Sequence, residues 1–145
     1  MGELKTRKGL KLFLRLGLGI AFLSASADRF GLWYKEVSAW GNMKNFIEYT
    51  AVLTPWVPDF ALPAVGWIAT IAEVVLGIFL IIGFKTELSA KLSGYLLLIF
   101  ALSMLFFLNP KSPFDYSVFA ASGAAFALSL MKEKYLEIDM LWSKK

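Results

Sequence analysis

The stretch ALPAVGWIATIAEVVLGIFLIIGF, from Ala61 to Phe84, decides the fold class of this chain. Its only charged residue is Glu73, and it is long enough to cross the apolar core of a bilayer, which needs about 20 helical residues. A charge near the bilayer centre costs about 2.5 to 3.5 kcal/mol on insertion scales, so such a residue normally faces a bundle interior and pairs with another polar group. The stretch therefore predicts a membrane-spanning helix in which Glu73 has a partner or a function.

The whole chain is apolar enough to lie largely in lipid. Of its 145 residues, 58% are hydrophobic and 18% are charged, and its mean hydropathy is +0.63, which is too apolar for an ordinary soluble domain. Segments suited to spanning a bilayer occur at residues 10–29, 61–84, 88–108 and 114–131. We therefore predict an all-α fold: an integral membrane four-helix bundle that forms a single domain over residues 1–145.

Lysine and arginine residues gather in the segments that would lie on one side of the membrane. That side would carry Lys5, Arg7, Lys8, Lys11, Lys85, Lys91, Lys132, Lys134, Lys144 and Lys145, and the other side only Arg29, Lys35, Lys44 and Lys111. Because basic residues favour cytoplasmic loops, we expect both termini to be cytoplasmic, in the cytoplasmic (inner) membrane of a bacterium or archaeon. This topology accounts for the net charge of +4, so nucleic acid is not expected as a partner.

The residue types that are missing exclude several kinds of chemistry. The chain has no cysteine and no histidine, which excludes thiol exchange, thiolate catalysis, haem ligation by histidine and any metal site built from these side chains. No nucleophile–base pair or phosphate-binding loop is recognisable in the sequence. We therefore assign no catalytic residue and no metal ligand, and we do not expect the chain to be an enzyme on its own.

Two helix faces direct the charged residues of the first two spans toward the bundle interior. In the first span, residues at steps of three and four share one face, and they are Arg15, Gly19, Phe22, Ser26 and Arg29. In the second span, the corresponding face holds Gly66, Ala69, Glu73 and Gly77. Small residues on such faces allow helices to approach closely, so packing is the simpler interpretation for them. Glu73 is predicted to point inward with them.

Glu73 needs a polar partner near its own depth in the membrane. Counting about 1.5 Å per residue from the cytoplasmic ends of the spans, Arg15 lies about 8 Å deep and Glu73 about 16 Å deep, so an extended arginine could reach the carboxylate. Arg15 could equally extend to the cytoplasmic surface. Tyr95, in the third span, offers a hydroxyl at a depth similar to that of Arg15. We predict that Glu73 is hydrogen-bonded to at least one of Arg15, Tyr95 and Arg29, and we take all four as candidate binding residues.

A second group of polar residues lies at the outer ends of the spans. It adds Asp28 and Tyr116 to the candidate binding residues and places Arg29 beside them. Polar and aromatic residues at span ends normally anchor a helix at the membrane surface, so anchoring is the simpler interpretation.

The first outer loop is rich in aromatic residues and carries few charges. From Val37 to Leu53 its apolar residues follow a helical period, and Pro55 and Pro58 then end the pattern. We predict a short interfacial helix in this loop, lying over the outer mouth of the bundle.

Short motifs in the first two spans resemble those of the DoxX family of small four-span membrane proteins. The first span contains RLGLG at residues 15–19 and ends with DRFG at residues 28–31. The second span contains IAEVVLG at residues 71–77, followed by IGFKT at residues 82–86, and these are similar to the Glu, Gly and Gly-x-x-Thr pattern of the family. The resemblance runs from about Leu10 to Leu130. The chain departs from many members at Glu87, where they have arginine, and in the ending of the last span.

The resemblance implies a partner of redox enzymes, because DoxX members have been linked to the membrane part of thiosulfate:quinone oxidoreductase and to oxidative-stress complexes. We therefore expect an accessory or anchoring membrane subunit of a quinone-linked redox system, without a covalent cofactor and with a quinone or lipid between its helices. The expected partners are the lipid bilayer and a soluble or membrane oxidoreductase, and an oligomer is compatible with this role. One alternative is a small membrane carrier or proton-linked binding protein in which Glu73 titrates and Arg15 or Arg29 holds an anion. A purely structural membrane protein is the other.

Overall fold

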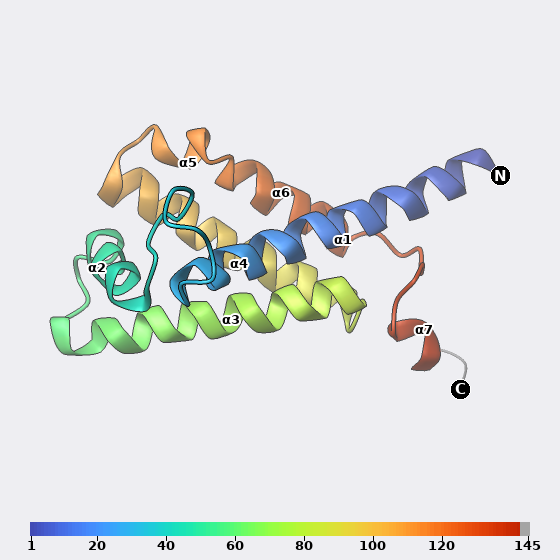
Figure 1. Cartoon of the computed structure of the whole chain (residues 1–145). Helices are drawn as coiled ribbons and strands as arrows, with labels where there is room; N and C mark the ends of the chain where they lie inside the picture. The colour runs from blue at the N-terminus through green and yellow to red at the C-terminus, as the bar shows by residue number, and fades with distance from the viewer. Residues whose placement is uncertain (143–145) are drawn as a thin grey trace.

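The computed structural model describes residues 1–142, which fold into helices joined by short connections (Figure 1). In chain order the α-helices are α1 (Gly2–Arg29), α2 (Met43–Leu53), α3 (Leu62–Ile82), α4 (Thr86–Ser103), α5 (Ser112–Asp115), α6 (Val118–Ser129) and α7 (Asp139–Trp142). A 3₁₀ turn at Asp59–Ala61 leads into α3, and a π-helical turn at Met104–Leu108 extends α4. The predicted all-α bundle is confirmed over the described residues, with α1, α3, α4 and α6 as its members.

Different helices and connections lie at the two ends of the bundle (Figure 1). The first turns of α1, the connection between α3 and α4, and α7 lie at one end, here called the terminal end. Helices α2 and α5 lie at the opposite end, here called the loop end. The first and last residues that the structure describes are therefore on the same side of the bundle.

Three helical segments are long and apolar enough to cross a membrane. They are Gly2–Arg29, Asp59–Ile82 and Thr86–Leu108. The fourth segment differs from the uninterrupted span predicted at residues 114–131, because α5 stops at Asp115 and the backbone of Ser117 is left-handed, with φ at +55°. The 12 residues of α6 span about 18 Å, which is shorter than the apolar core of a bilayer.

Glycines allow close contact within two helix pairs. A Cβ atom on Gly19 of α1 would lie 2.8 Å from the carbonyl oxygen of Gly77 in α3, so these two helices touch along their backbones. In the other pair, Gly94 of α4 leaves room for the ring of Phe126 in α6, and its carbonyl accepts a hydrogen bond from the hydroxyl of Ser122 at 2.8 Å. Buried apolar side chains from all four helices fill the centre, and they are Leu18, Phe22, Leu76, Leu80, Ala90, Ala125 and Leu128.

Two glycines of α1 provide a matched test of this packing. We expect Gly19→Ala to lower the free energy of unfolding by about 1 to 3 kcal/mol, because the added methyl group would overlap Gly77 and Ile81 of α3. Gly17 has no neighbouring atom within 4 Å of an added Cβ, so Gly17→Ala should instead raise stability by about 0.5 to 1 kcal/mol through helix propensity. Unfolding by SDS in mixed micelles, followed by circular dichroism, measures both. Equal effects of the two substitutions would contradict the packing described here.

The predicted helix of the first outer loop is present but shorter than expected. Helix α2 begins at Met43 instead of Val37, because the side chain of Asn42 accepts a hydrogen bond from the backbone N–H of Asn45 at 2.9 Å and so caps the helix there. Just before it, Gly41 has a φ of +75°, which interrupts any helix that precedes it. The buried residues of α2 are Phe46, Thr50 and Leu53, and this face packs against α3.

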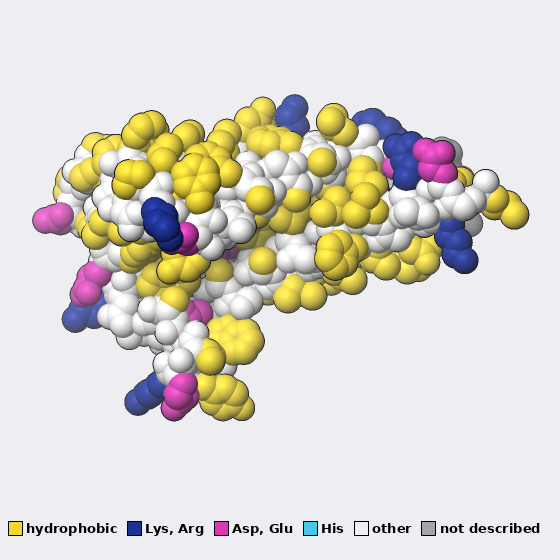
Figure 2. All heavy atoms as spheres, turned by 90° about the horizontal axis from the view of Figure 1, so that it is seen from above, with side chains coloured by type: hydrophobic (Ala, Val, Ile, Leu, Met, Phe, Trp, Pro, Cys, Tyr) yellow, Lys and Arg dark blue, Asp and Glu magenta, His cyan; other side chains and the backbone are white. Residues whose placement is uncertain are grey.

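The sides of the bundle are apolar. Figure 2 shows most charged side chains toward the two ends of the molecule, with a mostly hydrophobic surface between them. Exposed apolar residues along the helices include Phe13, Ile20, Ile68, Ile71 and Ile99. A surface of this kind on helices of spanning length suits contact with lipid.

Candidate functional site

A buried ion pair between Arg29 and Glu73 lies inside the bundle. Arg29 is the last residue of α1, and Glu73 lies in the middle of α3. The Nη2 atom of Arg29 is 3.0 Å from Oε1 and 2.9 Å from Oε2 of Glu73, and both side chains are 2% exposed. Charges so far from water interact more strongly than they would at a surface. The pair therefore connects α1 to α3 within the apolar part of the bundle.

Groups from three helices surround this pair. The second terminal nitrogen of the arginine, Nη1, donates a hydrogen bond to Thr70 Oγ1 at 2.8 Å, and Ser26 Oγ lies 3.5 Å from the carboxylate. The ring centroid of Phe46, in α2, is 3.5 Å from the guanidinium carbon, and the ring of Trp40 is 5.2 Å from it. Aromatic faces attract a cation, most strongly where water is excluded. Helix α2 thus covers the pair from the loop end.

The contact between Glu73 and Arg29 confirms that Glu73 is bonded to at least one of its three predicted partners. Of the two alternatives for Arg15, the one in which it reaches Glu73 is not found. Arg15 binds at Leu80, which lies seven residues beyond Glu73 in α3. Seven residues correspond to about 10 Å along a helix. Arg15 and Glu73 therefore belong to separate polar clusters.

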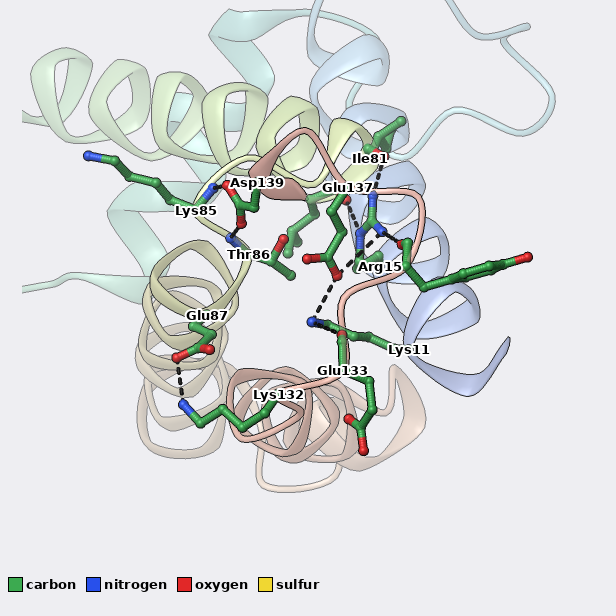
Figure 3. A network of polar contacts seen from close by, with 12 residues as sticks. Lys11, Arg15, Ile81, Lys85, Thr86, Glu87, Lys132, Glu133, Glu137 and Asp139 are labelled. Atoms are coloured by element: carbon green, nitrogen blue, oxygen red, sulfur yellow. Dashed lines mark hydrogen bonds and ion pairs between the residues drawn. The ribbon is translucent and has the colours of Figure 1, made fainter. Parts of the chain in front are cut away.

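Arg15 binds the last turn of α3 (Figure 3). Its Nε donates to the carbonyl oxygen of Leu80 and its Nη2 to that of Ile81, both at 2.9 Å. The last carbonyl groups of a helix lack partners within it and carry partial negative charge, so a cation satisfies them well. The Nη1 atom donates to the carbonyl oxygen of Tyr135, also at 2.9 Å. Arg15 is fully buried, and it ties α1 both to α3 and to the C-terminal residues.

Residues 131–142, here called the C-terminal strap, bring an acid to two buried cations of α1 (Figure 3). Glu137 Oε1 lies 2.8 Å from Lys11 Nζ and 3.6 Å from Arg15 Nη1. Lys11 also donates to the carbonyl oxygen of Glu133 at 2.6 Å. Lys11 is 2% exposed and lies one helical turn from Arg15. We call Lys11, Arg15 and Glu137 the terminal cluster.

Asp139 of the strap caps the first turn of α4. Its carboxylate accepts hydrogen bonds from the backbone N–H groups of Lys85 at 2.6 Å and Thr86 at 2.8 Å. A carboxylate at this position satisfies free amides and the positive end of the helix dipole. Gly83 allows the strap to come this close, since its φ is +71° and a Cβ atom on it would lie 2.7 Å from the Cα atom of Glu137.

The strap was not predicted from the sequence, because its acids stand in a short polar tail without a helical pattern. The inward face of the first span carries a pattern from which an acidic partner could have been predicted. Lys11 lies four residues before Arg15 on that face, and two inward cations require an acid at the same level.

The model of the DoxX family matches residues 10–109. The chain belongs to the DoxX family. No curated protein and no solved structure matches it. Family membership, together with three helices of spanning length, identifies a membrane protein. The matched region of this DoxX chain includes Arg15, Arg29 and Glu73, whereas the C-terminal strap lies beyond it.

Two of the other predicted site residues of the DoxX chain lie on its surface. Tyr95 is 50% exposed and packs edge-on against Phe126, with ring centroids 5.1 Å apart. The side-chain partners of Glu73 are Arg29 and Ser26 and do not include Tyr95. Tyr116 is 74% exposed. Tyr116 is close enough to α2 to influence Tyr49, whose pKa is raised above its ordinary value by burial and, to a smaller extent, by Tyr116.

Asp28 is buried and holds the loop between α1 and α2 in place. Its carboxylate accepts hydrogen bonds from the backbone N–H groups of Ala39 at 3.0 Å and Trp40 at 2.8 Å, and from the hydroxyl of Ser38. The loop is thereby fixed to the end of α1 before α2 begins. Within residues 1–142 the acidic side chains do not form a group that could hold a metal ion.

An open hollow of about 280 Å³ lies where this loop meets α1. It is lined by Ser24, Asp28, Trp33, Val37 and Ala39. The indole Nε1 of Trp33 donates to the carbonyl oxygen of Ser24 at 3.0 Å, so the ring forms one fixed wall. The hollow combines an aromatic wall with a few polar groups, as small-molecule sites do.

Proposed function

We propose that this DoxX chain is an accessory or anchoring subunit of a quinone-linked redox system, in the cytoplasmic (inner) membrane of a bacterium or archaeon. The observation that carries the proposal is the Arg29–Glu73 pair, in which each charge already has its partner within the chain. A buried pair of opposite charges constrains how the helices that carry it pack, because separating the two leaves a charge buried alone. The redox chemistry is then supplied by a soluble or membrane oxidoreductase, as the family resemblance implies.

The surroundings of Glu73 favour an anchor over a proton-linked carrier. A carrier of protons needs an acid that reaches water on one side of the membrane and changes partners during transport. Here Arg29 and Ser26 contact the carboxylate, and Phe46 covers the guanidinium. Glu73 is therefore better suited to holding α1, α2 and α3 together than to exchanging protons.

The hollow beside Asp28 is the place where we propose that a quinone or lipid binds. Trp33 supplies a flat apolar wall, and the hydroxyl of Ser24 can donate a hydrogen bond to a carbonyl oxygen. The hollow is open to the outside of the bundle, so a small molecule can enter it without a change in the fold. The ligand would be held without a covalent bond.

Deletion of the chain from its host tests the proposed role. Membranes that lack it should lose quinone-dependent electron transfer and should retain less of the oxidoreductase, because the membrane anchor is gone. Both should return when the wild-type chain is restored. Unchanged electron transfer and unchanged membrane retention would contradict the proposal and favour a purely structural protein. Proton-coupled uptake of an anion by vesicles that contain only the purified chain would instead identify a carrier.

The membrane orientation can be tested with single cysteines, because the chain has none of its own. We expect a cysteine introduced by Glu48→Cys, on the exposed face of α2, to react with an impermeant maleimide in intact cells. Leu141→Cys, at the terminal end and 72% exposed, should react only after the inner face has been opened. The reverse order of labelling would show that the termini are outside.

A further inference from the structure

The C-terminal strap covers two cations, and one of them, Arg15, is positioned independently of it. Arg15 is held by α3, because its Nε and Nη2 atoms bind the carbonyl groups of Leu80 and Ile81. Only its Nη1 atom faces the strap. Lys11 stands one turn away on the same face of α1, and its amino group contacts Glu133 and Glu137 of the strap. Release of the strap would therefore uncover two neighbouring cations on one face of α1, with Arg15 still fixed by α3. These two side chains are here called the dibasic pocket.

The carboxylate of Glu137 shows which chemistry the pocket accepts. It is an oxyanion, and it lies 2.8 Å from Lys11 Nζ and 3.6 Å from Arg15 Nη1 (Figure 3). The other acids of the strap are engaged elsewhere, since Asp139 caps α4 and the carboxylate of Glu133 pairs with Arg7 at 2.7 Å. One carboxylate thus faces two cations. A phosphate monoester carries a charge of about −1.5 to −2 and three acceptor oxygens, so it matches two cations better.

The strap is built so that it can be displaced. Leu136, the residue before Glu137, has a φ of +48°, a left-handed conformation that costs about 1 to 2 kcal/mol for a residue with a Cβ atom. The side chains of Leu136 and Leu141 are 61% and 72% exposed, so they add little apolar burial against the bundle. Polar contacts hold the strap, and an anion that replaces Glu137 removes part of them. They are made by Glu133, Tyr135, Glu137, Ile138 and Asp139.

The surroundings of the pocket attract anions. Exposed lysines at the terminal end include Lys85, Lys91, Lys132 and Lys134. The pocket lies beside the last turn of α3, where the apolar span ends. Basic groups at this level of a membrane protein concentrate anionic lipid headgroups and soluble anions.

We propose that the dibasic pocket is a binding site for a phosphate group, and that Glu137 occupies it as an internal substitute while the strap is closed. Lys11 and the Nη1 atom of Arg15 bind the phosphate, and the strap moves away when phosphate takes the place of the carboxylate. The phosphate belongs either to an anionic lipid headgroup or to a soluble phosphate. This site does not depend on the proposed redox role, because it uses neither the Arg29–Glu73 pair nor the hollow.

Strap displacement is measured with a nitroxide attached through Leu141→Cys. The full-length chain is placed in nanodiscs of phosphatidylcholine, with or without phosphatidic acid, and inorganic phosphate is titrated separately in the phosphatidylcholine discs. Electron paramagnetic resonance should show a more mobile label when the phosphate source is present. Mobilisation by phosphatidic acid alone assigns a lipid site, and mobilisation by inorganic phosphate assigns a soluble one. A label that stays immobile with both sources overturns the proposal.

Three substitutions distinguish phosphate binding in the dibasic pocket from general attraction of phosphate to the exposed lysines. Glu137→Gln keeps the shape of the side chain and removes its charge, so the strap should no longer compete with phosphate for the two cations. If the strap is closed in about 90% of wild-type molecules, only about 10% can bind, and the substitution should raise the apparent affinity for phosphate about tenfold. Lys11→Gln should lower that affinity at least tenfold, whereas Lys134→Gln, with the same charge change at an exposed strap position, should leave it unchanged. Equal losses in the two lysine variants, or no gain in Glu137→Gln, would overturn the proposal. If Lys11→Gln fails to fold, the Glu137→Gln result decides.

Discussion

Glu73→Ala is expected to lower the free energy of unfolding by about 3 to 5 kcal/mol, because it leaves Arg29 buried without its carboxylate. Arg29→Ala should cost a similar amount for the same reason. The double variant should cost much less than the sum of the two, since no buried charge is then left alone. Unfolding by SDS in mixed micelles, followed by circular dichroism, gives all three values.

An exposed ion pair provides the control for this cycle. The Nζ atom of Lys111 lies 2.6 Å from Oδ1 of Asp115, but the two side chains are 78% and 51% exposed. Exposed pairs contribute about 0 to 1 kcal/mol, so Asp115→Ala should have little effect. Additive losses for Arg29→Ala and Glu73→Ala would mean that the two residues do not interact in the membrane.

Arg15→Ala is expected to destabilise the chain by about 3 to 5 kcal/mol through a different cluster. The substitution leaves the carbonyl groups of Leu80, Ile81 and Tyr135 without their donor. Because Arg15 and Glu73 lie in separate clusters, the losses of Arg15→Ala and Glu73→Ala should add to within about 0.5 kcal/mol in the double variant. The same SDS titration measures this sum.

Hydrogen exchange locates the effect of Arg15→Ala. The amides of Ile138 and Asp139, which bond to Ile82 and Gly83, should exchange faster, while those of α2 should be unchanged. Arg7→Ala is the matched control, because the side chain of Arg7 is 55% exposed in its pair with Glu133. A strong coupling between Arg15 and Glu73 would show that the two clusters communicate, contrary to the structure.

The inward position of Glu73 could be predicted because it is the only charge in a long apolar segment, and lipid offers such a charge no alternative. The close approach of α1 and α3 was likewise visible in the small residues Gly19 and Gly77. The partner of Glu73 was harder to choose. Depths counted from assumed span ends carry errors of several residues, whereas the contact between these glycines sets the register and places Arg29, not Arg15, beside the carboxylate.

Other features left little trace in the sequence. The break between α5 and α6 occurs at Ser117, where neither glycine nor proline marks it. The start of α2 depends on Asn42 and on a long-range contact from Asp28, which local periodicity does not reveal. The strap depends on polar contacts with residues far away in the chain. Helical periodicity indicates only which face of a helix is apolar, so it does not predict polar contacts between residues far apart in the chain.

The terminal cluster also has a consequence for how the protein is made. The strap group that binds Lys11 lies 122 residues later in the chain, so the first helix enters the membrane with the charges of Lys11 and Arg15 still unpaired. Unpaired basic residues at the end of a first helix are what keep that end in the cytoplasm during insertion. The strap, which follows much later in the chain, then covers both side chains and brings the carboxylate of Glu137 to them. The same two cations are thus unpaired on an isolated first helix and become part of the interior of the complete fold.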